Sequence, residues 1–129
     1  MQKINPETLA APRGYNNGVV MSGNKFLFVS GQIGWDRNER MAQGLVAQFD
    51  QALANILDVV QSAGATPECI GRLTIFVKDK QDYVARRTEI GVVYRNRMSK
   101  HFPAMSLLVV SDLLEEGALV EIEATAVIP

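Results

Sequence analysis

The last stretch of the chain, residues 119–128, constrains the fold more than any other. One side of this stretch, taken at every second position, carries Val120, Ile122, Ala124, Ala126 and Ile128. The other side carries Leu119, Glu121, Glu123, Thr125 and Val127. A period of two is typical of a strand with one buried face. Because an unpaired buried carboxylate is costly, Glu121 and Glu123 must face water, a polar partner or a ligand site.

The remaining pattern predicts strands and helices within a single domain that spans residues 1–129. Residues 1–17 are polar and rich in turn-forming residues, and we expect them to be an extended lead-in. The turn pair Gly23-Asn24 predicts a hairpin of strands 18–22 and 25–30. Further strands are expected at 70–77, 104–110 and 119–128, and helices at 44–63 and about 82–99.

The predicted order is β-β-α-β-α-β-β, which indicates an α+β fold with two helices on one face of a mixed sheet. Both crossover connections should be right-handed, so both helices fall on the same side. The opposite face then has no helix to cover it. Since Leu, Val and Met occupy both faces of strand 104–110, we expect other subunits to bury that face.

Composition excludes several classes of protein. The net charge of −1 gives no basic surface for nucleic acid, and no apolar run approaches the roughly 20 residues of a membrane span. The N-terminus lacks the apolar segment of a signal peptide, so a cytoplasmic protein is expected. One cysteine and one histidine form neither a disulfide nor a zinc cluster, and we expect no metal.

Several motifs resemble the Rid/YjgF family of enamine and imine deaminases. They are Gly14-Tyr15 and residues 28–33, 51–56, 63–65, 76–79, 102–104 and 120–124, in the same order and at compatible spacing over nearly the whole chain. The resemblance implies a chorismate-mutase-like homotrimer with its sites in clefts between subunits. It also implies hydrolysis of reactive enamines or imines to a carbonyl compound and ammonia, without metal or cofactor, which removes harmful metabolites.

The sequence departs from the family at two positions. An arginine after Phe-Pro-Ala grips the substrate carboxylate in the family, and a cysteine follows two residues later; here these positions hold Met105 and Leu107. A methionine cannot replace the bidentate guanidinium. The substrate carboxylate is therefore absent, masked as an ester or thioester, or bound elsewhere, unless the pocket has been lost and filled. Other anchors to consider are Arg13, Arg37, Arg86 and Arg87.

The resemblance assigns Glu121 as the acid that handles the attacking water, while a salt bridge between subunits or a solvated strand end is the structural alternative. Glu123 is given a structural role. Tyr15 matches the pocket tyrosine, although it would equally serve to anchor the N-terminal arm.

Three further residues are candidates for the site. Ser30 and Gly31 offer a hydroxyl and a free backbone N–H to a substrate oxygen where their strand leaves the sheet. Trp35 lies beside the glycine-rich end of that strand and would form an aromatic wall. A larger cyclic or aromatic-derived enamine would suit Met105, Leu107 and Trp35. A single tryptophan is, however, more often core or interface.

Two functions remain open at this point. The first is cofactor-free hydrolysis of a C=N or enamine intermediate other than the usual small 2-imino acids. The second is a non-catalytic trimer that binds a small metabolite or regulates a partner enzyme. Ribonuclease activity, which has been attached to parts of the family, is disfavoured by the charge and by the lack of a histidine pair.

Overall fold

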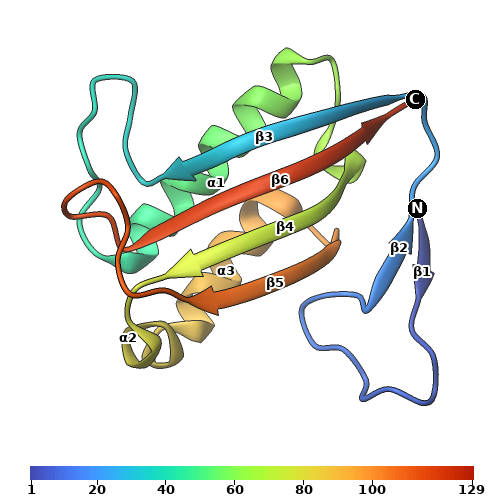
Figure 1. Ribbon diagram of the computed structural model, residues 1–129, viewed down its shortest axis with the longest axis horizontal. Helices are drawn as coiled ribbons and strands as arrows, with labels where there is room; N and C mark the ends of the chain where they lie inside the picture. Colours follow the sequence, from blue (N-terminus) through green and yellow to red (C-terminus); the bar gives the residue numbers. More distant parts are fainter.

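The main sheet has four strands in the order β3-β6-β4-β5 (Figure 1). Their bounds are β3 (Lys25–Ile33), β6 (Val120–Ile128), β4 (Ile70–Val77) and β5 (Ala104–Val109). Strand β6 is antiparallel to both β3 and β4, whereas β4 and β5 are parallel. The computed structural model, which describes residues 1–129, thus confirms the predicted α+β class with a mixed sheet.

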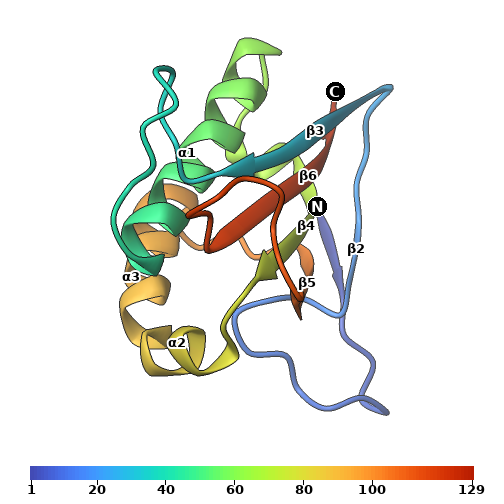
Figure 2. The same ribbon diagram turned by 60° about the vertical axis from the view of Figure 1, so that its left-hand side comes forward.

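The helices all lie on one face of this sheet (Figures 1 and 2). They are α1 (Leu45–Ser62), α2 (Lys80–Ala85) and α3 (Arg87–Met98), with a 3-10 turn, η1 (Pro67–Cys69), before β4. Helix α1 confirms the expected helix at 44–63. The expected helix at 82–99 is two helices, because the chain leaves helical geometry at Arg86, where α2 ends and α3 begins.

The predicted alternation in β6 is confirmed. Val120, Ile122 and Ala126 are fully buried and Ala124 is nearly so, and they belong to one core cluster with the apolar side of α1. Phe49, Leu53, Ile56 and Val60 make up that side of the helix. Burial of these side chains is the main source of stability for the two layers, at roughly 25 cal/mol per Å² of apolar surface.

The expected hairpin of strands 18–22 and 25–30 is wrong. Strand β2 (Gly18–Val20) pairs instead with β1 (Gln2–Ile4), a short strand inside the segment expected to be an extended lead-in. The turn at Gly23-Asn24 abuts the end of β6, where the Asn24 N–H donates to the Ile128 carbonyl oxygen (3.1 Å). A side chain at position 23 would collide with that carbonyl, so glycine lets β3 pair with β6 instead of β2.

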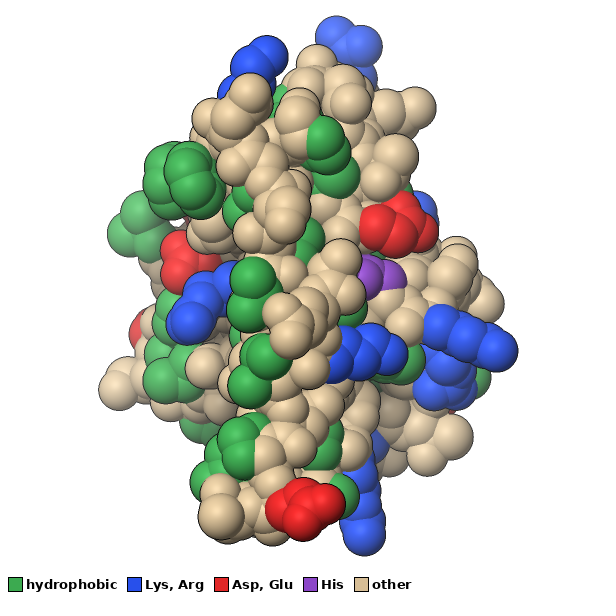
Figure 3. All heavy atoms as spheres, turned by 90° about the vertical axis from the view of Figure 1, so that its right-hand side faces the viewer, with side chains coloured by type: hydrophobic (Ala, Val, Ile, Leu, Met, Phe, Trp, Pro, Cys, Tyr) green, Lys and Arg blue, Asp and Glu red, His purple; other side chains and the backbone are tan.

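The face of the sheet opposite the helices is bare. Phe26 and Phe28 of β3 project from it with 65% and 77% of their surface exposed, and Glu121 and Glu123 point to the same side. Hydrophobic side chains project along the left edge of Figure 3, where this face is seen in profile. We expected such a face to be covered by other subunits, and its exposure in one chain fits that expectation.

None of the helices is both long and apolar enough to cross a membrane.

Candidate functional site

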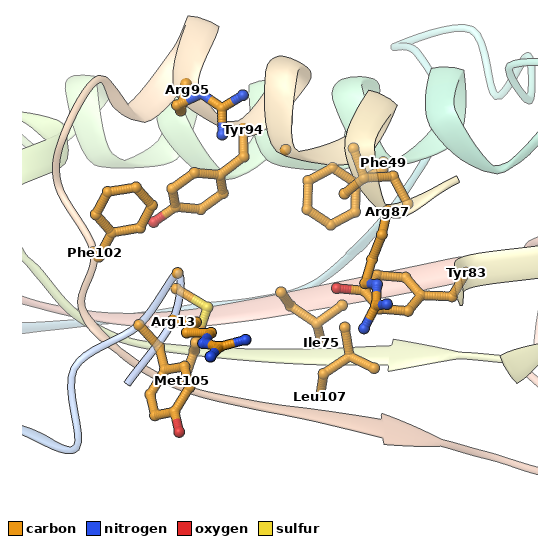
Figure 4. A pocket seen from close by; sticks show the side chains of 14 residues that line it. Arg13, Phe49, Ile75, Tyr83, Arg87, Tyr94, Arg95, Phe102, Met105 and Leu107 are labelled. Atoms are coloured by element: carbon orange, nitrogen blue, oxygen red, sulfur yellow. The ribbon is translucent and has the colours of Figure 1, made fainter. Parts of the chain in front are cut away.

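A cavity of about 410 Å³ lies on the helix side of the sheet, between α3, β5 and the loop that precedes β2 (Figure 4). Helix α1 packs closely over β3 and β6, whereas the backbone of α3 approaches α1 more closely than it approaches the sheet. The helix-side surface of the edge strand β5 is therefore left partly open. In the parallel ladder Leu107 lies beside Ile75 and Met105 beside Leu73, so Met105 and Leu107 both face this cavity.

The wall opposite the sheet is aromatic. Phe49, Tyr83, Tyr94 and Phe102 line it, and the rings of Tyr94 and Phe102 are stacked with their centroids 5.3 Å apart. The Tyr94 hydroxyl donates to the carbonyl oxygen of His101 (2.7 Å), which fixes the ring. A wall of this kind suits a ligand with a planar or apolar body.

The two tyrosine hydroxyls differ in their availability to a ligand. Burial raises the pKa of Tyr94 well above its ordinary value, and the hydroxyl is already bonded within the chain. Burial also raises the pKa of Tyr83, an effect that the nearby positive charge of Arg87 partly opposes. The Tyr83 phenol is therefore neutral at pH 7 and, since it has no hydrogen-bond partner in the chain, is free to donate to a ligand.

The loop before β2 closes the cavity at its mouth. Asn16 holds the loop in place, because its N–H donates to the Pro103 carbonyl oxygen (3.1 Å) and its side-chain amide donates to the Phe102 carbonyl oxygen. The preceding residues Arg13, Gly14 and Tyr15 then line the cavity. Tyr15, whose surface is 37% exposed, therefore belongs to the candidate site. This position is also compatible with a role in anchoring the N-terminal segment.

Three arginines, Arg13, Arg87 and Arg95, line the cavity, and no acidic residue does. None of their three guanidinium groups forms an ion pair or hydrogen bond within the chain. By contrast, Arg86 pairs with Asp82 (2.7 Å) and Arg97 pairs with Asp50. Unpaired guanidinium groups around an apolar space favour an anionic ligand.

The arginines reach the cavity from different sides (Figure 4). Arg13 comes from the loop on the side of Met105, Arg87 extends from α3 toward the sheet, and Arg95 lies beyond the Tyr94 ring. Of the arginines considered as anchors from the sequence, Arg13 and Arg87 are therefore in the cavity. Arg37 lies in a separate depression, and Arg86 is engaged by Asp82 and Glu89.

Arg95 was not recognised from the sequence, nor were Tyr83 and Phe49 as lining residues. A signal was present, because Arg87, Gly91 and Arg95 follow at intervals of four and so share one face of a helix. Gly91 leaves room on that face. A Cβ at this position would lie 3.3 Å from Nη1 of Arg95.

The residues Ser30, Gly31 and Glu121 form a second group, on the bare face of the sheet. Ser30 and Gly31 make a bulge in β3, where two residues stand opposite the single Glu123 of β6. The Glu121 carboxylate packs over Gly31. A Cβ atom at position 31 would lie only 2.9 Å from Cδ of Glu121, so a side chain there would collide with the glutamate. Neither Glu121 nor Glu123 has an ion-pair partner within the chain.

The sheet separates these two groups. Glu121 is paired with Phe76 on the bare face, while Ile75 and Leu107 point to the cavity on the other face. Trp35 belongs to neither group: it follows β3, bridges to Met41, and lines the depression that holds Arg37. The chain contains no cluster of three or more His, Cys, Asp or Glu side chains able to hold a metal ion.

Comparison with known proteins identifies the family. The family model described as Endoribonuclease L-PSP matches residues 6–128. The chain belongs to this family. A RutC family protein (slr0709) of Synechocystis is 35% identical over 100% of this chain and 98% of its own length. A 2-iminobutanoate/2-iminopropanoate deaminase of Capra hircus is 31% identical over 88% of this chain and 79% of its own.

Solved structures described as Rid and YjgF proteins share the fold. The Rid family protein YyfB of Yersinia pestis, described as of unknown function, superposes with a TM-score of 0.87 at 32% identity over 98% of both chains. The YjgF gene product of E. coli gives 0.71 at 29% identity, again over 98% of both. The resemblance to the Rid proteins predicted from the motifs is thereby confirmed.

The positive charge of the cavity does not come from β5. At the position where the resemblance places an arginine, β5 carries Met105, and the cationic groups of the cavity come from the loop and from α3. The cavity has therefore not been filled by the apolar replacements Met105 and Leu107. It remains open and carries positive charge from other elements.

Proposed function

We propose that the protein hydrolyses a reactive enamine or imine to a carbonyl compound and ammonia, without metal or cofactor, in a site completed between the subunits of a homotrimer. The observation that carries the proposal is the pair of half-sites on the two faces of the sheet. One is an open cavity with unpaired arginines, and the other is the unpaired Glu121 carboxylate over Gly31. Some relatives are named as imine deaminases, which supports this class of reaction.

The reaction balances with water alone. Water adds to the C=N carbon, and Glu121 accepts a proton from the attacking water and delivers it to the nitrogen. The hydroxyl proton of the resulting carbinolamine is then transferred to the nitrogen as the C–N bond breaks and the C=O bond forms, so that an imine and one water give one carbonyl compound and one ammonia. A partly exposed carboxylate without an ion-pair partner is suited to this transfer.

Ser30 and Gly31 have a positioning role in this proposal. Their bulge places the Gly31 backbone against the Glu121 side chain, and Ser30, which is exposed, precedes it in the same bulge. A hydroxyl or N–H in that place stabilises negative charge on the substrate as water adds. Because the cavity lies on the other face, the substrate meets Glu121 only when a second subunit supplies it.

Ammonia release tests the proposal. Freshly generated 2-iminopropanoate, 2-iminobutanoate and imines of aromatic 2-amino acids are mixed with the protein, and the decay of the imine is compared with the spontaneous rate. We expect Glu121→Gln to lower the catalysed rate by about 10²-fold or more. The neighbouring acid offers a matched control, Glu123→Gln, which should retain most of the rate. Full activity of Glu121→Gln would overturn the mechanism.

A second substitution examines the departure from the family. If the scaffold and Glu121 are competent, Met105→Arg should raise activity on the small 2-imino acids relative to the wild type. Equal activity of both proteins on small imines would mean that another anchor already serves them.

A second function, binding or regulation without turnover, is favoured by one observation: the cavity of a single chain contains no acid for water activation. It predicts stoichiometric ligand binding with no ammonia release from any imine. We do not favour RNA cleavage despite the family's description. The only histidine, His101, is buried and hydrogen-bonded to the Ile70 carbonyl oxygen (2.7 Å), so no histidine pair exists.

A further inference from the structure

We infer that Arg13 and Arg87 hold the carboxylate of the substrate, and that the substrate is a 2-imino or 2-enamino acid with an aromatic or long apolar side chain. This inference rests on the proposed function and names the substrate class of the same site. The sequence left open whether the substrate carboxylate is absent, masked or bound at another position. Under this inference the carboxylate is present and is bound by arginines outside β5.

The charge of the cavity supports a retained carboxylate. Arg13 and Arg87 line it without any acidic neighbour among the lining residues and without an ion pair elsewhere in the chain. The neighbouring Arg86 differs in this respect, because it forms ion pairs with both Asp82 and Glu89. Two free guanidinium groups that enter from separate elements can grip both oxygens of one carboxylate.

The positions of the two arginines are fixed by their surroundings. The hydrogen bonds of Asn16 to Phe102 and Pro103 hold the loop that carries Arg13 against the cavity. Arg87 begins α3 and lies close enough to Tyr83 for its charge to act on the pKa of that phenol. In Figure 4 both side chains extend toward the space above Met105 and Leu107. A carboxylate bound there would lie at the open edge of the sheet.

The size and lining of the cavity define the rest of the substrate. A volume of about 410 Å³ is on the scale of sites that enclose drug-sized ligands, so a three- or four-carbon acid would leave most of it to water. Phe49, Tyr94 and Phe102 line it with rings, and Met105 and Leu107 are flexible or apolar. Aromatic bodies are stabilised by such walls through burial and stacking.

Equilibrium binding of the stable 2-oxo acid products tests the inference separately from catalysis. Phenylpyruvate, its methyl ester and pyruvate are titrated by calorimetry into the full-length protein. We expect phenylpyruvate to bind about tenfold or more tightly than either the ester, which lacks the charge, or pyruvate, which lacks the ring. Arg13→Gln and Arg87→Gln should each weaken phenylpyruvate binding about tenfold and leave ester binding unchanged.

Arg37→Gln is the matched control, since Arg37 is also exposed and unpaired but lies outside the cavity. It should bind phenylpyruvate as the wild type does. The inference would be overturned if phenylpyruvate bound no more tightly than its ester or than pyruvate. It would also be overturned if both cavity variants bound phenylpyruvate with full affinity. Either result would count against it even if the protein deaminates small imines. If the expected binding pattern is found but no imine is hydrolysed, the anchor stands and the proposed deamination fails.

Discussion

The two faces of the sheet differ in what covers them and in what chemistry they carry. The helix-side face is packed with fully buried residues such as Ile122 and opens only at the cavity beside β5, where the charged groups are arginines. The other face is bare, with Phe28 exposed and with the carboxylates Glu121 and Glu123. The cavity side therefore presents arginines without an acidic neighbour, whereas the bare face presents Glu121 and Glu123 together with Arg72.

Under the proposed function, this difference means that one chain carries all the residues of the site without forming it. By the strand register, Glu121 of β6 and Met105 of β5 point to opposite faces of the sheet, so the two side chains of one chain cannot contact the same substrate. If subunits associate through their bare faces, the exposed phenylalanines become buried. The same association would supply an acid to the cavity, which has none of its own. Stability of the assembly and completion of the site would then be one event.

The largest expected effect comes from placing a charge on the bare face. In Phe28→Asp a carboxylate would have to be buried without a partner between subunits, at a cost of several kcal/mol per subunit. We expect sedimentation to show a trimer for the wild type and a monomer for the variant, with an unchanged far-UV circular dichroism spectrum. Val92→Asp, at an exposed valine of α3, should remain a trimer. A wild type that sediments as a monomer would contradict the account.

The next largest effect is a difference in stability between substitutions at two neighbouring residues of β6 that point to opposite faces. Ile122→Ala removes a fully buried side chain and should lower the free energy of unfolding by about 2–5 kcal/mol. Glu123→Ala should change it by no more than about 0.5 kcal/mol when both are measured by urea denaturation in the monomeric Phe28→Asp protein. Similar losses from the two changes would remove the distinction between the faces.

A smaller effect concerns the wall of the cavity. Tyr94→Phe leaves the His101 carbonyl oxygen without its donor and should cost about 1 kcal/mol at pH 7. Burial raises the pKa of Tyr94 above its ordinary value of 10.0. Its contribution to stability is therefore complete below pH 10 and is lost as the pH rises above that value.

The difference in unfolding free energy between wild type and Tyr94→Phe should accordingly shrink as the pH is raised from 7 past 10. Urea denaturation at a series of pH values measures it. A difference that stays constant to about pH 11 would mean that Tyr94 titrates alike in the folded and unfolded chain.

Much of the fold could be predicted because local patterns agree with tertiary structure. The helical spacing ahead of Gly64 gave α1, and the run from Ile70 to Val77 matched β4 at both ends. The pairing of β2 could not be predicted. The turn at Gly23-Asn24 has the residues of a hairpin, but its geometry is decided by the end of β6, more than 100 residues away in sequence.

The candidate site was only partly predictable for a similar reason. The alternation in β5 correctly placed Met105 and Leu107 on one face, yet nothing local showed that Glu121 points to the other face of the sheet. Arg13 and Arg87 were two of several exposed arginines in the sequence. Only the packing of α3 against α1, and the clamping of the loop by Asn16, distinguish them from Arg37.

The most direct test of the central claim is complementation between two inactive variants. Glu121→Gln keeps the cavity but lacks the acid, whereas the double variant Arg13→Gln/Arg87→Gln keeps the acid but lacks the anchor. Each is assayed alone for ammonia release from an imine of an aromatic 2-amino acid, and the two are then unfolded together and refolded as a mixture. If each site joins a cavity and an acid from different subunits, about a quarter of the sites in an equal mixture are intact, and activity returns. If the mixture remains as inactive as its components, the two faces do not form a shared site and the account is contradicted.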